Sequence, residues 1–77
     1  MKTIHVLGSG CANCQRTAAL IEAVAAERGV AIQLDKVTDF AKIAAYGVMS
    51  TPGVVIDGTV VHAGGVPSRE AVQGWFG

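Results

Sequence analysis

The sequence has only two cysteines in 77 residues, and its charges balance, with six Lys plus Arg against six Asp plus Glu. Two thiols cannot complete the four-ligand shell of a structural zinc site. Without net charge there is no basic field for nucleic acid or for anionic lipid, so we expect neither as a partner. The 51% hydrophobic and 16% charged content is typical of a globular chain. We expect one domain over residues 1–77.

Long apolar runs are also missing. No segment approaches the roughly 20 apolar residues of a membrane span. The N-terminal stretch MKTIHVLGSGC is interrupted by His5 and is too short for the apolar region of a secretory signal. We therefore expect a cytoplasmic protein that does not associate with membranes. In a reducing compartment a close cysteine pair is more often catalytic or metal-binding than structural.

The first half of the chain has the pattern of a β-α-β unit. The β-branched residues 2–7 predict a strand, and residues 12–28 predict an amphipathic helix that ends at Gly29. Residues 30–37 alternate apolar and polar side chains, as a half-buried strand does. Strands joined by a helical crossover pair in parallel, so these two strands should be parallel neighbours.

The second half predicts a short helix, a hairpin and a last helix. Thr38 or Asp39 can cap a helix that ends at Gly47 and has an apolar face. In GVVIDGTVVHAGG, residues 53–65, Asp57-Gly58 is a strong signal for a two-residue hairpin turn. Ser68 can cap a helix over residues 69–76. The side chains assigned to packing in this half are Phe40, Ile43, Ala44, Met49, Val72, Trp75 and Phe76, whereas His62 is expected to be exposed.

The cysteines stand two residues apart in GSGCANC, directly after the first predicted strand. Cys11 falls at the start of the first helix, where free backbone N–H groups and the helix dipole favour an anion. The pKa of its thiol should therefore fall below the usual value of about 8.5. Cys14 lies one turn deeper on the buried face and should keep a higher pKa. An exposed nucleophile beside a sheltered resolving thiol is the division that thiol–disulfide exchange needs.

A second segment, YGVMSTPGVVIDG at residues 46–58, places Thr51-Pro52 directly before the hairpin. Together with the β-α-β-α-β-β-α order and the C-x-x-C pair that opens the first helix, it resembles the thioredoxin superfamily, and within it the small redox-active disulfide proteins. The resemblance runs from end to end and implies a minimal thioredoxin fold of class α/β, with a four-stranded mixed sheet flanked by three helices. It also implies that Pro52 is cis and packs against the cysteine pair, and that the Thr51 backbone pairs with a substrate strand.

The sequence departs from the best-known members in two places. Ala12-Asn13 replaces the Gly-Pro of thioredoxin and the Pro-Tyr of many glutaredoxins, and no tryptophan flanks Cys11. Gly64-Gly65 resembles the glutathione-binding turn of glutaredoxins, but residues 66–69 do not supply the acidic or paired polar side chains that follow it there. The ordinary interpretation of Gly64-Gly65 is a turn that ends a strand.

Two charged or titratable residues are candidates for tuning the thiols. Arg16 stands two residues after the second cysteine, where glutaredoxins carry a basic residue, and its charge would favour a thiolate at Cys11. His5 stands six residues before Cys11, where thioredoxins carry a buried acid, and it would shuttle a proton. The ordinary interpretations are a solvated helix residue for Arg16 and a strand residue at the sheet margin for His5.

These residues predict a monomeric thiol–disulfide oxidoreductase without a cofactor or a resident metal. Its partners would be protein disulfide substrates and a reductase that the sequence does not identify. One alternative is a soft-metal module, because GSGCANC resembles the loop of copper chaperones in which two thiolates hold Cu(I); those domains, however, carry methionine where Ser9 stands and have the order β-α-β-β-α-β. Further alternatives are a glutathione-dependent glutaredoxin and an iron–sulfur carrier shared between two chains.

Overall fold

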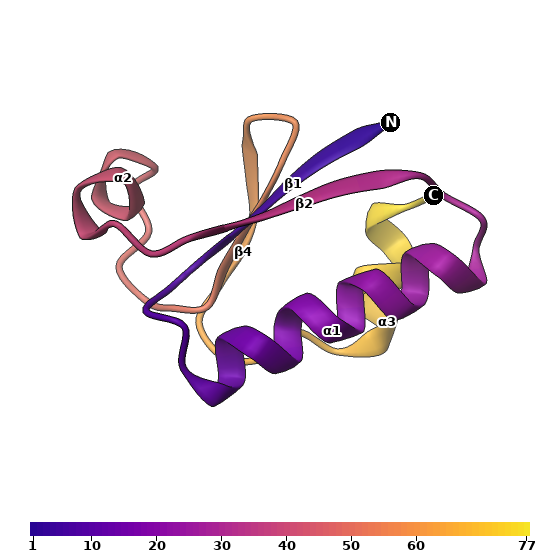
Figure 1. Ribbon diagram of the computed structural model, residues 1–77, viewed down its shortest axis with the longest axis horizontal. Coiled ribbons are helices and arrows are strands. Elements are labelled where there is room, and N and C mark those ends of the chain that lie inside the picture. Colours follow the sequence, from indigo (N-terminus) through magenta and orange to yellow (C-terminus); the bar gives the residue numbers. More distant parts are fainter.

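The computed structural model describes residues 1–77 and contains seven elements in the predicted order (Figure 1). The strands are β1 (Lys2–Leu7), β2 (Ile32–Val37), β3 (Gly53–Ile56) and β4 (Thr59–Ala63). The helices are α1 (Ala12–Glu27), α2 (Phe40–Ala45) and α3 (Arg69–Trp75). The predicted β-α-β-α-β-β-α order is confirmed, and β2 begins two residues later than the alternation suggested.

The four strands form one mixed sheet in the order β2-β1-β3-β4. β1 is parallel to β2 and antiparallel to β3, and β3 and β4 form an antiparallel hairpin. The hairpin turn uses Asp57 and Gly58, whose φ angles of 48° and 86° are the positive values that a tight two-residue turn demands. The predicted four-stranded mixed sheet is therefore confirmed.

This topology collects several loops at one end of the sheet. The parallel strands β1 and β2 end on the same side, β3 begins there, and β4 ends there, since Gly53 pairs with both Leu7 and Ala63. The Gly8 N–H donates to the Val37 carbonyl at 2.9 Å and ties two of these loops together. We call residues 8–11, 38–39, 48–52 and 64–65 the loop end; it lies on the side of α2 in Figure 1, away from the N-terminus.

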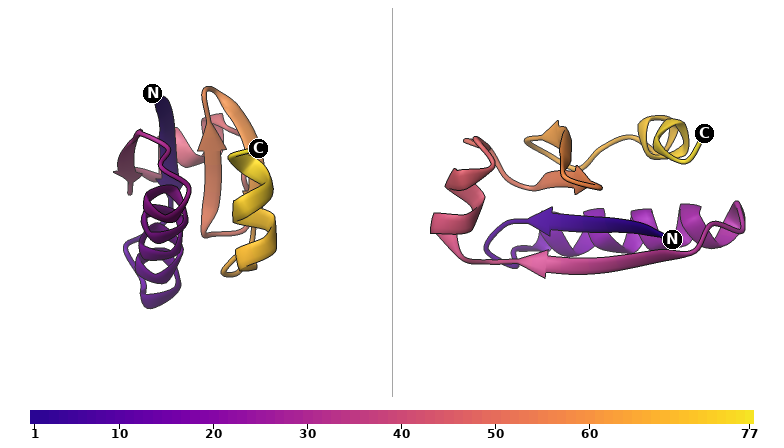
Figure 2. Two further views of the ribbon diagram at one scale, coloured as in Figure 1. Left: turned by 90° about the vertical axis from the view of Figure 1, so that its right-hand side faces the viewer. Right: turned by 90° about the horizontal axis from the view of Figure 1, so that it is seen from above.

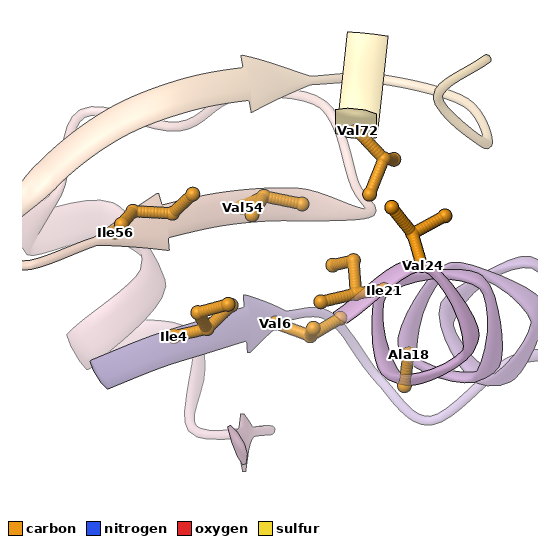
Figure 3. Close-up of a cluster of buried hydrophobic side chains, with 8 residues drawn as sticks. All are labelled: Ile4, Val6, Ala18, Ile21, Val24, Val54, Ile56 and Val72. Atoms are coloured by element: carbon orange, nitrogen blue, oxygen red, sulfur yellow. The ribbon is translucent and has the colours of Figure 1, made fainter. Parts of the chain in front are cut away.

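Helices α1 and α3 lie on one face of the sheet and α2 lies near the other (Figure 2). Successive strand residues point to opposite faces, so the central strands β1 and β3 each serve two cores. The larger core joins the sheet to α1 and α3, and the smaller one joins it to α2 and the loop that follows. The buried residues of the larger core are drawn in Figure 3: Ile4, Val6, Ala18, Ile21, Val24, Val54, Ile56 and Val72. Those of the smaller core are Leu7, Ile43, Val48 and Val55.

The short helices begin at side-chain caps, as the sequence predicts. The Asp39 carboxylate accepts from the Ala41 N–H at 2.8 Å, and the Ser68 hydroxyl accepts from the Ala71 N–H at 3.1 Å. Helix α1 differs, because its N-cap residue is Cys11 and no side chain caps its first turn. None of the three helices has the length and apolar character of a membrane-spanning helix.

Four side-chain assignments from the sequence are wrong. Phe40 is 73% exposed, Met49 is 98% exposed and Ala44 is also exposed, although all three were expected to pack. The reason is that α2 has only six residues and buries a single side chain, Ile43, against the sheet. His62 was expected to be exposed but is half-buried, because the Trp75 ring packs beside it with a distance of 6.1 Å between the two ring centroids.

Candidate active site

The two cysteines lie together at the start of α1. Cys11 is the exposed N-cap residue, and Cys14, one turn into the helix, is only 5% exposed. Both are free thiols, and their Sγ atoms are 3.0 Å apart, within hydrogen-bonding distance for sulfur. The i, i+3 spacing across the first helical turn thus produces one accessible and one sheltered sulfur.

The surroundings shift the two thiols in opposite directions. The pKa of Cys11 is lowered, chiefly because the Cys14 thiol donates a hydrogen bond to it and secondly because the Cys14 backbone N–H does so. This N–H belongs to the uncapped first turn of α1 and has no carbonyl partner within the helix. The pKa of Cys14 is raised, first by burial and then by its hydrogen bond to Cys11. The asymmetry expected from helix position is present: the neighbouring thiol is the main cause of the lowered pKa at Cys11, and burial is the main cause of the raised pKa at Cys14.

Gly8 lies beside both Cys14 and Thr51. A Cβ atom at Gly8 would collide with the Cys14 Sγ, and the same position lies 3.5 Å from the Thr51 Cβ. Because Gly8 has no side chain, the Cys14 sulfur and the Thr51 side chain both approach this buried glycine. The space that a side chain at Gly8 would need is already taken by the second thiol.

The Thr51-Pro52 peptide bond is cis, Pro52 is buried, and Thr51 is exposed. The Pro52 carbonyl accepts from the Gly64 N–H at 3.0 Å, so the turn after β4 is attached to this segment. Gly64 and Gly65 have φ angles of 87° and 68°, which favour glycine. The fold therefore gathers the cysteines, Thr51-Pro52 and the glycine turn at the loop end, although they are far apart in the sequence.

Arg16 and His5 are placed differently. Arg16 is exposed on α1 and is not among the groups that shift the pKa of Cys11. The His5 Nε2 lies 3.7 Å from an Asp35 carboxylate oxygen, and its ring centroid lies 6.4 Å from that of Tyr46. Its Nδ1 is buried without a hydrogen-bond partner. His5 alternates with Ile4 and Val6, which face α1, so its side chain points to the other face of the sheet, and the structure does not bring it to the cysteines.

A family model described as a thioredoxin domain matches residues 2–77. The chain belongs to the thioredoxin family.

Two relatives of this thioredoxin-family chain match almost throughout. It is 36% identical to a protein named Thioredoxin from Methanocaldococcus jannaschii over 73 residues, which cover 95% of this chain and 84% of that protein. It is 30% identical to a protein named Thioredoxin from Methanothermobacter thermautotrophicus, also over 73 residues, which cover 95% of each chain. The matched length includes the cysteines and the cis-proline segment.

The thioredoxin-family site offers two sulfurs and little else to a metal ion. The structure contains no group of three or more His, Cys, Asp or Glu side chains placed to hold one. The two thiols are adjacent soft ligands, which is the feature shared with copper chaperones. No other observation in the structure favours a metal module, a glutathione site or a cluster carrier.

The rate of alkylation of the reduced protein should depend on pH differently for the two thiols. Because the pKa of Cys11 is lowered, its thiolate forms at lower pH, and its alkylation rate should reach a plateau below the pH that an ordinary thiol needs. Cys14, whose pKa is raised, should reach its plateau only at higher pH. Mass spectrometry of the labelled peptides would assign each rate to its cysteine.

Two variants test the cause of this shift. In Cys14→Ser a hydroxyl can still donate to the Cys11 sulfur, whereas in Cys14→Ala nothing can. The Cys11 plateau should stay low in the serine variant and move to higher pH in the alanine variant. Identical profiles in the two variants would show that the Cys14 side chain does not lower the pKa of Cys11.

Proposed function

We propose that the chain is a thiol–disulfide oxidoreductase that exchanges a dithiol for a disulfide with protein substrates. The observation that carries the proposal is the pair itself: an exposed Cys11 with a lowered pKa, 3.0 Å from a buried Cys14 with a raised pKa. Membership of the thioredoxin family supports the same activity. Cys11 is the nucleophile and Cys14 is the resolving thiol.

In the first step the Cys11 thiolate attacks one sulfur of the client disulfide. A Cys11–client disulfide forms, the client S–S bond breaks, and the departing client sulfur takes up a proton. Cys14 suits this step because its raised pKa keeps it protonated, so it stabilises the attacking thiolate as a donor and does not compete as a nucleophile.

In the second step Cys14 resolves the mixed disulfide. Its sulfur loses a proton and attacks the Cys11 Sγ, which forms the Cys11–Cys14 disulfide and releases the second client thiol. Two electrons have then passed from the protein to the client, and the two client thiols carry one proton from Cys14 and one from solvent. A separate reductase that carries its own dithiol would then reduce the Cys11–Cys14 disulfide, and no prosthetic group of this chain takes part.

The remaining loop-end residues hold the client. Thr51 is exposed beside Gly8 and Cys14, and we propose that its backbone pairs with an extended client segment while the buried Pro52 fixes the loop beside the sulfurs. The protein would act as a monomer in the reducing cytoplasm, where a dithiol can be regenerated.

Trapping of mixed disulfides tests this proposal. In Cys14→Ser the first step proceeds and the second cannot, so incubation with a disulfide-bonded protein such as insulin should yield a covalent adduct through Cys11. Non-reducing electrophoresis and mass spectrometry would detect the adduct. Dithiothreitol should reduce its disulfide and separate the two proteins.

Cys11→Ser is the matched control. This variant keeps the buried thiol and loses the exposed one, so it should form no adduct and should not reduce insulin. Adducts through Cys14 in Cys11→Ser, at the rate seen for Cys11 in Cys14→Ser, would reverse the assigned roles. Absence of adducts from both variants would contradict the proposed function.

A further inference from the structure

The loop end is almost free of charge. The chain has six Lys plus Arg and six Asp plus Glu. Of these, only Asp39 lies within residues 8–11, 38–39, 48–52 and 64–65. Its carboxylate is engaged as the cap of α2. Arg69, which begins α3, is turned to the far end of α1, where it contacts the Glu27 carboxylate at 2.7 Å. A client approaching Cys11 therefore meets no lysine or arginine in these loops.

Two large apolar side chains stand exposed at the same end. Met49 is 98% exposed and belongs to the loop that leads into Thr51. Phe40 is 73% exposed and directly follows Asp39 at the start of α2. Single exposed apolar residues are common on protein surfaces. These two differ because they lie at the end of the sheet that also contains the exposed thiol, where Asp39 is the only charged residue of the loops. Met49 is also only two residues from Thr51.

The backbone beside Met49 is free to bind. Residues 49–51 take part in none of the backbone hydrogen bonds of the structure, and all three are exposed. Thr51 lies against Gly8, whose other neighbour is the Cys14 sulfur. Unpaired N–H and C=O groups next to a strand accept an added extended segment, and side chains beside them select its residues. A client segment paired with residues 49–51 would thus lie across the thiols with Met49 beside it.

We propose that Met49 is a specificity-determining residue, which selects client disulfides in extended segments with apolar neighbours and disfavours those with carboxylates. The inference rests on the proposed function and names its substrate class. An unbranched thioether adapts to many apolar shapes, so Met49 favours apolar neighbours in general. Glutathione disulfide has four carboxylates, for which these loops offer no lysine or arginine, and it has no apolar side chain to contact Met49, so it is a poor substrate.

Two disulfide-linked peptide dimers test the proposal. The peptides are identical except that leucine and valine flank the cysteine in one, and glutamates flank it in the other. Release of peptide thiol by the reduced protein is measured in single turnover, and each rate is divided by the rate with dithiothreitol to remove differences in intrinsic reactivity. The wild-type protein should prefer the apolar dimer by about tenfold, the scale of a lost apolar contact. Glutathione disulfide, normalised in the same way, should resemble the acidic dimer.

Two substitutions of Met49 should move this preference in opposite directions. Met49→Glu should slow the apolar dimer by about fivefold to tenfold and slow the acidic dimer at least as much. Met49→Lys should slow the apolar dimer but accelerate the acidic one. Val60→Glu, at an exposed valine near the hairpin turn on the opposite end of the sheet, should leave both rates unchanged.

The outcomes separate this inference from the function on which it rests. Equal normalised rates for the two dimers, or variants of Met49 that behave as wild type, would overturn the role of Met49 while exchange through Cys11 continued. Failure of the wild-type protein to reduce either dimer would overturn both. A Met49→Lys protein that gains rate on the acidic dimer supports the proposal even if the glutamate variant folds poorly.

Discussion

Gly8→Ala is expected to slow closure of the Cys11–Cys14 disulfide by about tenfold or more, since misplacing a reacting atom by about 1 Å has effects of this size. The new methyl group would collide with the Cys14 Sγ, so the sulfur or the loop must move. If the sulfur moves away from Cys11, the hydrogen bond across 3.0 Å is lost and the pKa of Cys11 rises toward its ordinary value. Overpacking of this buried site should also lower the free energy of unfolding by about 1–3 kcal/mol.

Stopped-flow oxidation with a small disulfide would measure closure, and the pH profile of Cys11 alkylation would report the lost hydrogen bond. Gly74→Ala is the matched control, because a Cβ at that glycine meets open space in α3. It should leave closure unchanged and raise the free energy of unfolding by about 0.5–1 kcal/mol through better helix propensity. A Gly8→Ala protein with wild-type closure and a wild-type alkylation profile would contradict the assigned role of Gly8.

Ile21→Ala should produce the largest loss of stability, about 2–5 kcal/mol. Ile21 is completely buried in α1 and belongs to the core that joins α1 to the sheet and α3 (Figure 3). Removing three carbons leaves a cavity that rigid neighbours cannot fill. A domain of this length has a free energy of unfolding of about 4–12 kcal/mol, so this loss is a large share of the total.

Urea titration followed by circular dichroism would measure the change. Glu22→Ala, on the exposed side of the same helix, should alter the free energy of unfolding by no more than about 0.5 kcal/mol. A loss below about 1 kcal/mol in Ile21→Ala would mean that the core collapses around the missing side chain and that α1 is held less firmly than its burial indicates.

Most of the fold follows from the local sequence. Asp57-Gly58 between two valine-rich runs specifies the hairpin, Asp39 and Ser68 act as caps, and the apolar face of residues 12–27 matches the buried face of α1. These signals are short-range, because turns and caps depend on neighbouring residues. The strand order β2-β1-β3-β4 is not local and became visible only in the structure.

The errors arise where burial depends on distant parts of the chain. Phe40 and Met49 are as apolar as the core residues, but nothing packs over them, and residue type alone cannot show that. His62 is covered because Trp75 reaches it from α3.

The candidate site was predicted in its chemistry more than in its geometry. The position of Cys11 at a helix start indicates a lowered pKa, and its accessibility and direction of shift agree. The main cause, donation from the Cys14 thiol, depends on a rotamer and on the space that Gly8 leaves. Likewise, His5 stands the same number of residues before the first cysteine as a buried acid of thioredoxins does. The alternation of β1, however, turns the His5 side chain to the face of the sheet opposite to α1.

The positions of the two chain ends make the protein convenient to handle in experiments. Both ends lie away from the loop end in Figure 1, and the Lys2 N–H donates to the Ala31 carbonyl beyond the far end of α1. The 16 residues of that helix separate this region from Cys11 by about 24 Å. A fluorophore, an affinity tag or a surface linker at either end would leave the thiols facing solvent. Client capture could therefore be followed on an immobilised protein, with no change to any residue near the sulfurs.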